Sequence, residues 1–154
     1  MGLIKLKREK AELSALEAVC DALGQMRVEL SSRLAPIPEL AGILSRRTQG
    51  DARRFFALLC SKLNKLGERE LCELWCECAE TELCALNADA LRDFIALGQI
   101  LGRGELDLQL AAIARCEASS RQTLAEGRTR FAGQRRLTLG VSASAGLMLV
   151  IMLI

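Results

Sequence analysis

The sequence contains no histidine and no tyrosine, and it has only two prolines among 154 residues. Without histidine, a Ser-His or Cys-His nucleophilic pair cannot form. The nucleotide-binding pattern GxxxxGK[ST] does not occur, and the step Gly102-Arg103-Gly104 is too short to be a phosphate loop. We therefore predict that the chain has no catalytic residues and binds no cofactor. Any nucleotide-driven work would come from a partner.

Excess charge of either sign is also lacking, since the formal net charge is only +2 at pH 7. So small a charge does not attract nucleic acid strongly, and we expect no nucleic-acid partner. The positive residues are nevertheless unevenly placed, because they gather near the start of the chain and again before its last eighteen residues. They are Lys5, Lys7, Arg8 and Lys10, followed much later by Arg128, Arg130, Arg135 and Arg136.

The last eighteen residues, 137–154, contain no charged side chain and are apolar on all sides. A helix of this length reaches about 27 Å, close to the ~30 Å thickness of the bilayer hydrocarbon. A buried C-terminal core helix is the alternative, but a small helical domain has difficulty enclosing so many uncharged residues. We predict a membrane anchor from Leu137 to Ile154. The positive-inside rule then places the preceding domain in the cytoplasm.

Two features near the predicted anchor each have two interpretations. Small residues recur at four-residue spacing, in Gly140 and Ser144 and in Ser142 and Gly146. This spacing lets membrane helices approach closely and would suit a homo-oligomer, or it reflects ordinary small-residue content. The two basic clusters would face anionic headgroups together if the first and last long helices are antiparallel, at about 1 kcal/mol per residue. Otherwise they are solvated ends.

Aromatic residues make up only 3% of the chain while leucine and alanine abound, which favours helices over strands. Apolar residues recur at three- and four-residue steps, and no segment alternates with a period of two. The first long helix should bury one such stripe, made of Leu6, Leu13, Leu16, Cys20, Leu23, Met26, Leu30 and Leu34. Pro36 should end the first helix and Gly67 the third, while Asp51 and Asn87 should be N-caps. We predict an all-helical bundle, domain 1–136, followed by a transmembrane helix, 137–154. The bundle helices are 5–34, 37–44, 52–66, 68–86, 88–101 and 105–131.

Seven cysteines without a signal peptide indicate reduced thiols in a reducing compartment. Four of them lie in positions 72–84, and four thiolates can hold zinc. At ~100° per residue they point in different directions around one helix, and no CxxC pair occurs. We predict no metal site and interpret the cysteines as small buried hydrophobes. A cysteine-based metal or redox protein remains the alternative. The four are Cys72, Cys76, Cys78 and Cys84.

Three stretches resemble a known family. They are LSALEAVCDALGQMRVELSSRLAPIPEL in residues 13–40, LGQILGRGELDLQL in residues 97–110, and RRLTLGVSASAGLMLVIMLI in residues 135–154. Together they span most of the chain, which resembles the stage III sporulation protein AB family of endospore-forming bacteria. That family normally has an N-terminal transmembrane helix as well. Here residues 1–4 lead directly into charge and are too short to span, so we expect the chain to be single-pass as it stands: either an N-terminal helix is missing from it, with the basic run 5–10 as the cytoplasmic flank of that helix, or it is a single-pass variant.

The resemblance implies a fold similar to the cytoplasmic domain of type II secretion F proteins. It implies a non-enzymatic platform for a secretion-type ATPase, working with other stage III sporulation proteins in the channel between mother cell and forespore. The location would be the mother-cell membrane around the forespore, with the bulk of the chain cytoplasmic. A platform subunit of a general type II secretion or pilus system is the alternative.

Partner contacts are expected at conspicuous surface connections, because such loops often carry function. Two connections stand out, one that is polar in residues 46–50 and one at the corner before the last helix of the bundle. The candidate contact residues are Arg46, Arg47, Gly102, Arg103 and Asp107.

Overall fold

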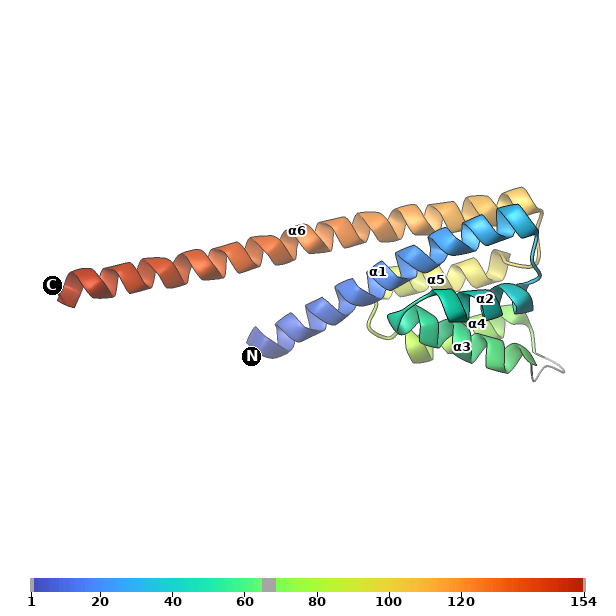
Figure 1. The fold of residues 1–154 in the computed structure, drawn as a ribbon, viewed down its shortest axis with the longest axis horizontal. Coiled ribbons are helices and arrows are strands. Elements are labelled where there is room, and N and C mark those ends of the chain that lie inside the picture. Colours follow the sequence, from blue (N-terminus) through green and yellow to red (C-terminus); the bar gives the residue numbers. More distant parts are fainter. Residues whose placement is uncertain (1, 65–68, 154) are drawn as a thin grey trace. The chain divides into compact units, whose positions relative to one another are not determined.

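The computed structural model describes the backbone of residues 2–64 and 69–153, and the side chains of residues 3–63 and 69–133. Over these residues the predicted all-helical fold is confirmed (Figure 1). Contacts divide the chain into two compact units, Met1–Leu124 and Ala125–Ile154. The helices are α1 (Gly2–Arg33), α2 (Ile37–Arg47), α3 (Gly50–Asn64), α4 (Leu71–Glu82), α5 (Ala88–Ile100) and α6 (Leu106–Leu153).

The first unit is a bundle in which consecutive helices pack on one another. Helix α2 contacts α3, α3 contacts α4, and α4 contacts α5, while α1 packs on both α2 and α3. The first turns of α6 belong to this unit too, because Ile113, Cys116 and Leu124 join its hydrophobic core. Helix α6 then continues through Gly133 and through the segment predicted to be the anchor.

Helix α1 buries most of the apolar stripe that the sequence predicted. Leu16, Leu23 and Met26 are almost completely buried. The prediction of burial was wrong at the two ends of the stripe, because Leu6 and Leu34 are exposed. At Leu34 the backbone turns into the left-handed region, with φ of +51°, so its side chain leaves the line of the helical stripe.

The predicted polar connection 46–50 is shorter than expected. Helix α2 extends to Arg47, and only Thr48 and Gln49 separate it from α3. Gly50 takes a φ of +62°, a conformation that glycine tolerates, and α3 already begins there. Asp51 therefore lies in the first turn of α3 rather than at its N-cap, and its carboxylate accepts a hydrogen bond from Arg54.

Helix α4 was predicted to be longer than it is, since it ends at Glu82 rather than near residue 86. Leu83 and Leu86 remain buried, but in a turn closed by the Leu86 N–H and the Leu83 carbonyl at 3.1 Å. The N-cap at Asn87 is confirmed, because its Oδ1 accepts from the Ala90 N–H at 2.8 Å. The break after α5 is also confirmed, with Gly102 at φ +80°. Gly67, the predicted end of α3, lies outside the described residues.

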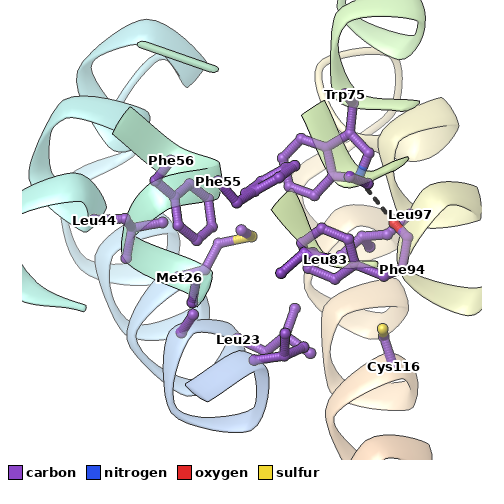
Figure 2. Packing of buried hydrophobic residues seen from close by; sticks show 14 of the residues in the cluster. Leu23, Met26, Leu44, Phe55, Phe56, Trp75, Leu83, Phe94, Leu97 and Cys116 are labelled. Carbon is purple, nitrogen blue, oxygen red and sulfur yellow. Dashed lines mark hydrogen bonds between the residues drawn. The ribbon is translucent and has the colours of Figure 1, made fainter. Parts of the chain in front are cut away.

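An aromatic cluster forms the centre of the core (Figure 2). The Trp75 ring stacks on Phe94 with centroids 5.0 Å apart and meets Phe55 edge-on at 4.8 Å. Its Nε1–H donates to the Phe94 carbonyl at 2.8 Å, which satisfies the one polar atom of the indole. Phe56 lies against the other side of Phe55, at 4.9 Å. These four rings join α3, α4 and α5 into one core.

Within the residues that the structure describes, no helix is both long enough and apolar enough to cross a membrane. The predicted anchor, residues 137–154, falls in a stretch whose side chains lie outside the described residues. The anchor and the domain boundary at residue 136 therefore stay predictions.

Candidate functional site

The two predicted contact regions lie at opposite ends of α2. Arg46 and Arg47 form its last turn. At the other end, a Cβ placed on Gly102 would lie 3.9 Å from Cγ1 of Ile37, the first residue of α2. Eleven helical residues span about 15 Å, so the structure keeps these regions apart rather than joining them in one site.

The corner between α5 and α6 is closed by side chains. Gln109 folds back over it, donating from Nε2 to the Gly104 carbonyl at 2.8 Å and accepting the Gly102 N–H at 3.3 Å. Arg103 forms an ion pair with Glu70, which precedes α4. Asp107 is exposed in the first turn of α6. This corner therefore presents a fixed surface of exposed polar groups.

A groove of about 490 Å³ runs over α1 in the first unit. Its lining comes from α1 around Gly24, from a first wall that runs from Arg47, the last residue of α2, to Gln49, and from a second wall at Arg121 of α6. Because Gly24 has no side chain, Arg121 and its partner Glu117 approach α1 there; an added Cβ would meet the Glu117 carboxylate at 3.4 Å. The lining residues are Ala18, Asp21, Gly24, Gln25, Val28, Glu29, Arg47, Thr48, Gln49 and Arg121.

A buried glutamate positions Arg47 on the first wall. The Glu29 side chain is only 6% exposed, and its Oε1 lies 2.5 Å from Arg47 Nη1. Its Oε2 lies 3.6 Å from Nε of Arg33. Thr48 supports this wall, since its buried hydroxyl donates to the Leu44 carbonyl at 2.5 Å. Arg47 is thus held at the groove by a carboxylate that is closed to solvent.

A second buried glutamate, Glu117, holds Arg121 at the groove. The Glu117 side chain is 9% exposed, and its Oε1 accepts from Arg121 Nε at 3.1 Å and from Nη2 at 2.9 Å. Its Oε2 lies 3.5 Å from Nη2 of Arg27. The hydrogen bonds to Glu117 raise the pKa of Arg121 above its ordinary value, so this guanidinium stays charged.

Sequence reasoning found Arg47 but missed Glu29, Glu117 and the groove. A signal was present, because each glutamate interrupts an otherwise apolar helical face. Glu29 continues the seven-residue row of Ala15 and Ala22, both buried, and Glu117 lies one turn after buried Ile113. An acidic residue in such a row indicates a buried charge with a partner.

The predicted membrane-flanking residues fall in both units. Lys5, Lys7, Arg8 and Lys10 are exposed on the first turns of α1, together with Leu3 and Ile4, which are 75% and 76% exposed. In the second unit, Arg128 and Arg130 are exposed on α6. Arg135 and Arg136, like Leu137, Gly140, Ser144, Gly146 and Ile154, have side chains outside the described residues.

The cysteines are reduced and differ widely in environment. Cys20, Cys78 and Cys116 are buried, whereas Cys84 is exposed. Among the described side chains, no three metal-ligating residues gather to hold an ion. Burial raises the pKa of Cys116 to about 11, and burial also raises that of Cys78.

These environments predict the order in which iodoacetamide modifies the native full-length chain at pH 8. Cys84 should react first. Cys116 should react about a hundredfold more slowly than a free thiol, because its pKa lies near 11 rather than 9.0 and only the thiolate attacks. Mass spectrometry over a time course measures the order, and the unfolded chain, in which all seven thiols react alike, is the control. Early modification of Cys116 would contradict the structure and would favour the alternative of a cysteine-based redox protein.

Comparison with known proteins decides the family. A family model described as "Stage III sporulation protein AB (spore_III_AB)" matches residues 1–154. The chain belongs to the stage III sporulation protein AB family. A search of curated proteins gave no significant match.

The fold agrees with a member of the same family. This stage III sporulation protein AB chain is similar to a solved structure described as "Stage III sporulation protein AB (SpoIIIAB)". The TM-score is 0.70 at 13% identity, over 79% of this chain and 97% of that one. At this identity the likeness shows a shared fold. The family model confirms the resemblance drawn from the three sequence stretches.

Proposed function

We propose that this chain is a non-enzymatic, membrane-anchored component of the stage III sporulation assembly between mother cell and forespore, and that it serves as a platform for a secretion-type ATPase. The observation that carries the proposal is the family match over all 154 residues. The helical bundle supports it, because the first unit offers fixed surfaces for protein contacts and no histidine for nucleophilic catalysis.

Charge and apolar surface support a position at the membrane. Residues 137–154 are uncharged, and Arg135 and Arg136 precede them directly. The first turns of α1 expose Leu3 and Ile4 among basic residues, a composition that suits the headgroup region of a bilayer. The protein would lie in the mother-cell membrane around the forespore, with its bulk in the cytoplasm.

The partner contacts follow from the two ends of α2. Arg46 and Arg47 at one end, and Gly102, Arg103 and Asp107 at the other, form separate exposed surfaces. A platform that holds an ATPase and a channel component at once needs two such surfaces. Other stage III sporulation proteins are the expected partners, and self-association through the anchor would be compatible with both surfaces.

Localisation during engulfment tests the proposal. The full chain, fused to a fluorescent protein at Met1, should concentrate in the membrane around the forespore of an endospore-forming host. Deletion of residues 137–154 should release it into the cytoplasm, because the remaining chain has no other uncharged stretch of that length. Fluorescence microscopy and fractionation measure both outcomes.

A control variant carries an unrelated transmembrane helix of eighteen residues in place of 137–154, and it should restore membrane binding. Uniform membrane labelling with normal spore yield in a deletion strain would contradict the sporulation role and favour the general secretion or pilus alternative. A soluble signal from the intact chain would contradict the anchor itself.

A further inference from the structure

We infer that the groove over α1 binds an acidic segment of a partner protein. Arg47 and Arg121 bind the carboxylates of that segment. The inference rests on the proposed role as a component that works through protein contacts, and it names the chemistry of one such contact. The groove lies within the first unit, and every residue that lines it is described.

The groove and its immediate surroundings present mainly positive charge to solvent. Four arginines surround two glutamates, but the glutamate side chains are only 6% and 9% exposed. The arginine side chains are between 49% and 61% exposed. Asp21 is the one acidic lining residue that is exposed. Of the four arginines, Arg47 and Arg121 line the groove, whereas Arg27 and Arg33 pair with the same glutamates from outside its lining. Within the groove an incoming segment would therefore meet two guanidinium groups and the one exposed carboxylate of Asp21.

Arg47 and Arg121 both keep guanidinium donors that their bonds to the buried glutamates do not use. Arg47 engages Glu29 through Nη1, which leaves its Nε and Nη2 to donate. Arg121 engages Glu117 through Nε and Nη2, which leaves Nη1. A guanidinium has five donors in a planar fork that matches a carboxylate, so each of these two can bind a second acid while keeping the first.

The side chains of Arg47 and Arg121 are preorganised for binding. Each buried glutamate fixes one arginine on one wall, so little side-chain entropy is lost when a ligand binds. Gln25 and Gln49 also line the groove and add amide groups for polar contacts with the backbone of the segment. Exposed Val28 offers an apolar contact beside them. A protein segment with acidic side chains fits these groups better than a lipid headgroup alone, which would leave the amides and Val28 unused.

The test begins with a photo-crosslinking amino acid in place of Gln25, in the full chain expressed during engulfment. Mass spectrometry identifies the crosslinked segment, which should carry several Asp or Glu residues. The same segment, made as a synthetic peptide, is then titrated against the purified full chain in detergent micelles. The double variant R47Q/R121Q should bind it about tenfold more weakly or worse, because two charge-assisted hydrogen bonds are lost.

Matched variants separate loss of binding from loss of folding. Arg92→Gln removes an exposed arginine on α5, outside the groove, and should bind normally. Gln25→Trp fills the groove while keeping both arginines, and should also abolish binding.

Four results would overturn the inference: no adduct at position 25, an adduct with lipid, a crosslinked segment without acidic residues, or unchanged peptide affinity in a folded R47Q/R121Q variant. The proposed function fails on different grounds, namely normal sporulation in the deletion strain or a soluble intact chain. A correctly localised protein whose groove binds no acidic segment would thus overturn this inference alone.

Discussion

Replacing Trp75 by alanine should lower the free energy of unfolding by about 3–5 kcal/mol. The indole is 1% exposed and contacts Phe55, Phe56 and Phe94 with centroid distances of 4.8, 6.2 and 5.0 Å. Its removal leaves a cavity between α3, α4 and α5, and it deletes the hydrogen bond to the Phe94 carbonyl. Since domains are typically stable by only about 5–15 kcal/mol, this single change should remove a large part of the stability of the first unit.

Denaturant titration of the full chain in detergent, followed by circular dichroism, measures the loss. Fluorescence is unsuitable for the variant because Trp75 is the one tryptophan. Trp75→Phe is the matched control, since it keeps a ring in the cluster and should cost clearly less. Leu108→Ala, at a residue 59% exposed, should change stability by no more than about 0.5 kcal/mol. A Trp75→Ala variant as stable as Leu108→Ala would contradict the core described above.

Replacing Gly98 by alanine should destabilise the bundle by about 1–3 kcal/mol, although alanine is the better helix former. A Cβ at this position would lie 2.5 Å from Cδ1 and Cγ of the Trp75 ring and 2.9 Å from its Cβ. Atoms cannot approach so closely, so α5 or the indole must move. The indole is stacked on Phe94 and hydrogen-bonded to it, which makes that movement costly.

Gly133→Ala is the matched control. Gly133 also lies within a helix, but a Cβ there would have no atom within 4 Å. Without a clash only the gain in helix propensity remains, so this variant should be equal to the original chain or more stable by up to about 1 kcal/mol. The two changes are chemically identical, and thermal unfolding of both measures the effect of the Trp75 contact. Equal stability of the two variants would be the contradicting result.

Much of the fold could be predicted from local sequence signals. The spacing of Leu16, Leu23 and Met26 predicted the buried face of α1, and Asn87 and Gly102 predicted where α5 begins and ends. These signals work because helical periodicity, capping and glycine conformations depend on a few neighbouring residues. The end of α4 was missed, because Leu83 and Leu86 continue the helical pattern although the chain turns there to reach the Asn87 cap.

Less of the groove could be predicted from the sequence. The sequence drew attention to Arg47 as a loop residue, but it gave no means to pair it with Glu29, eighteen residues earlier. Glu117 and Arg121 are neighbours on one helix, yet their place at the groove depends on α6 crossing α1 beside Gly24. Such contacts depend on how helices pack, and helix periodicity alone does not fix which faces meet.

The sequence by itself determined an all-helical protein with an uncharged C-terminal segment and no histidine chemistry, and its three family-like stretches pointed to the stage III sporulation protein AB family. These properties depend on composition and on residues close together along the chain. Only the tertiary structure decided which charges are buried and which guanidiniums face solvent, because burial is set by the approach of α1, α2 and α6. The same acidic side chain that would be solvated on an isolated helix becomes, at Glu29 and Glu117, the buried support of an arginine.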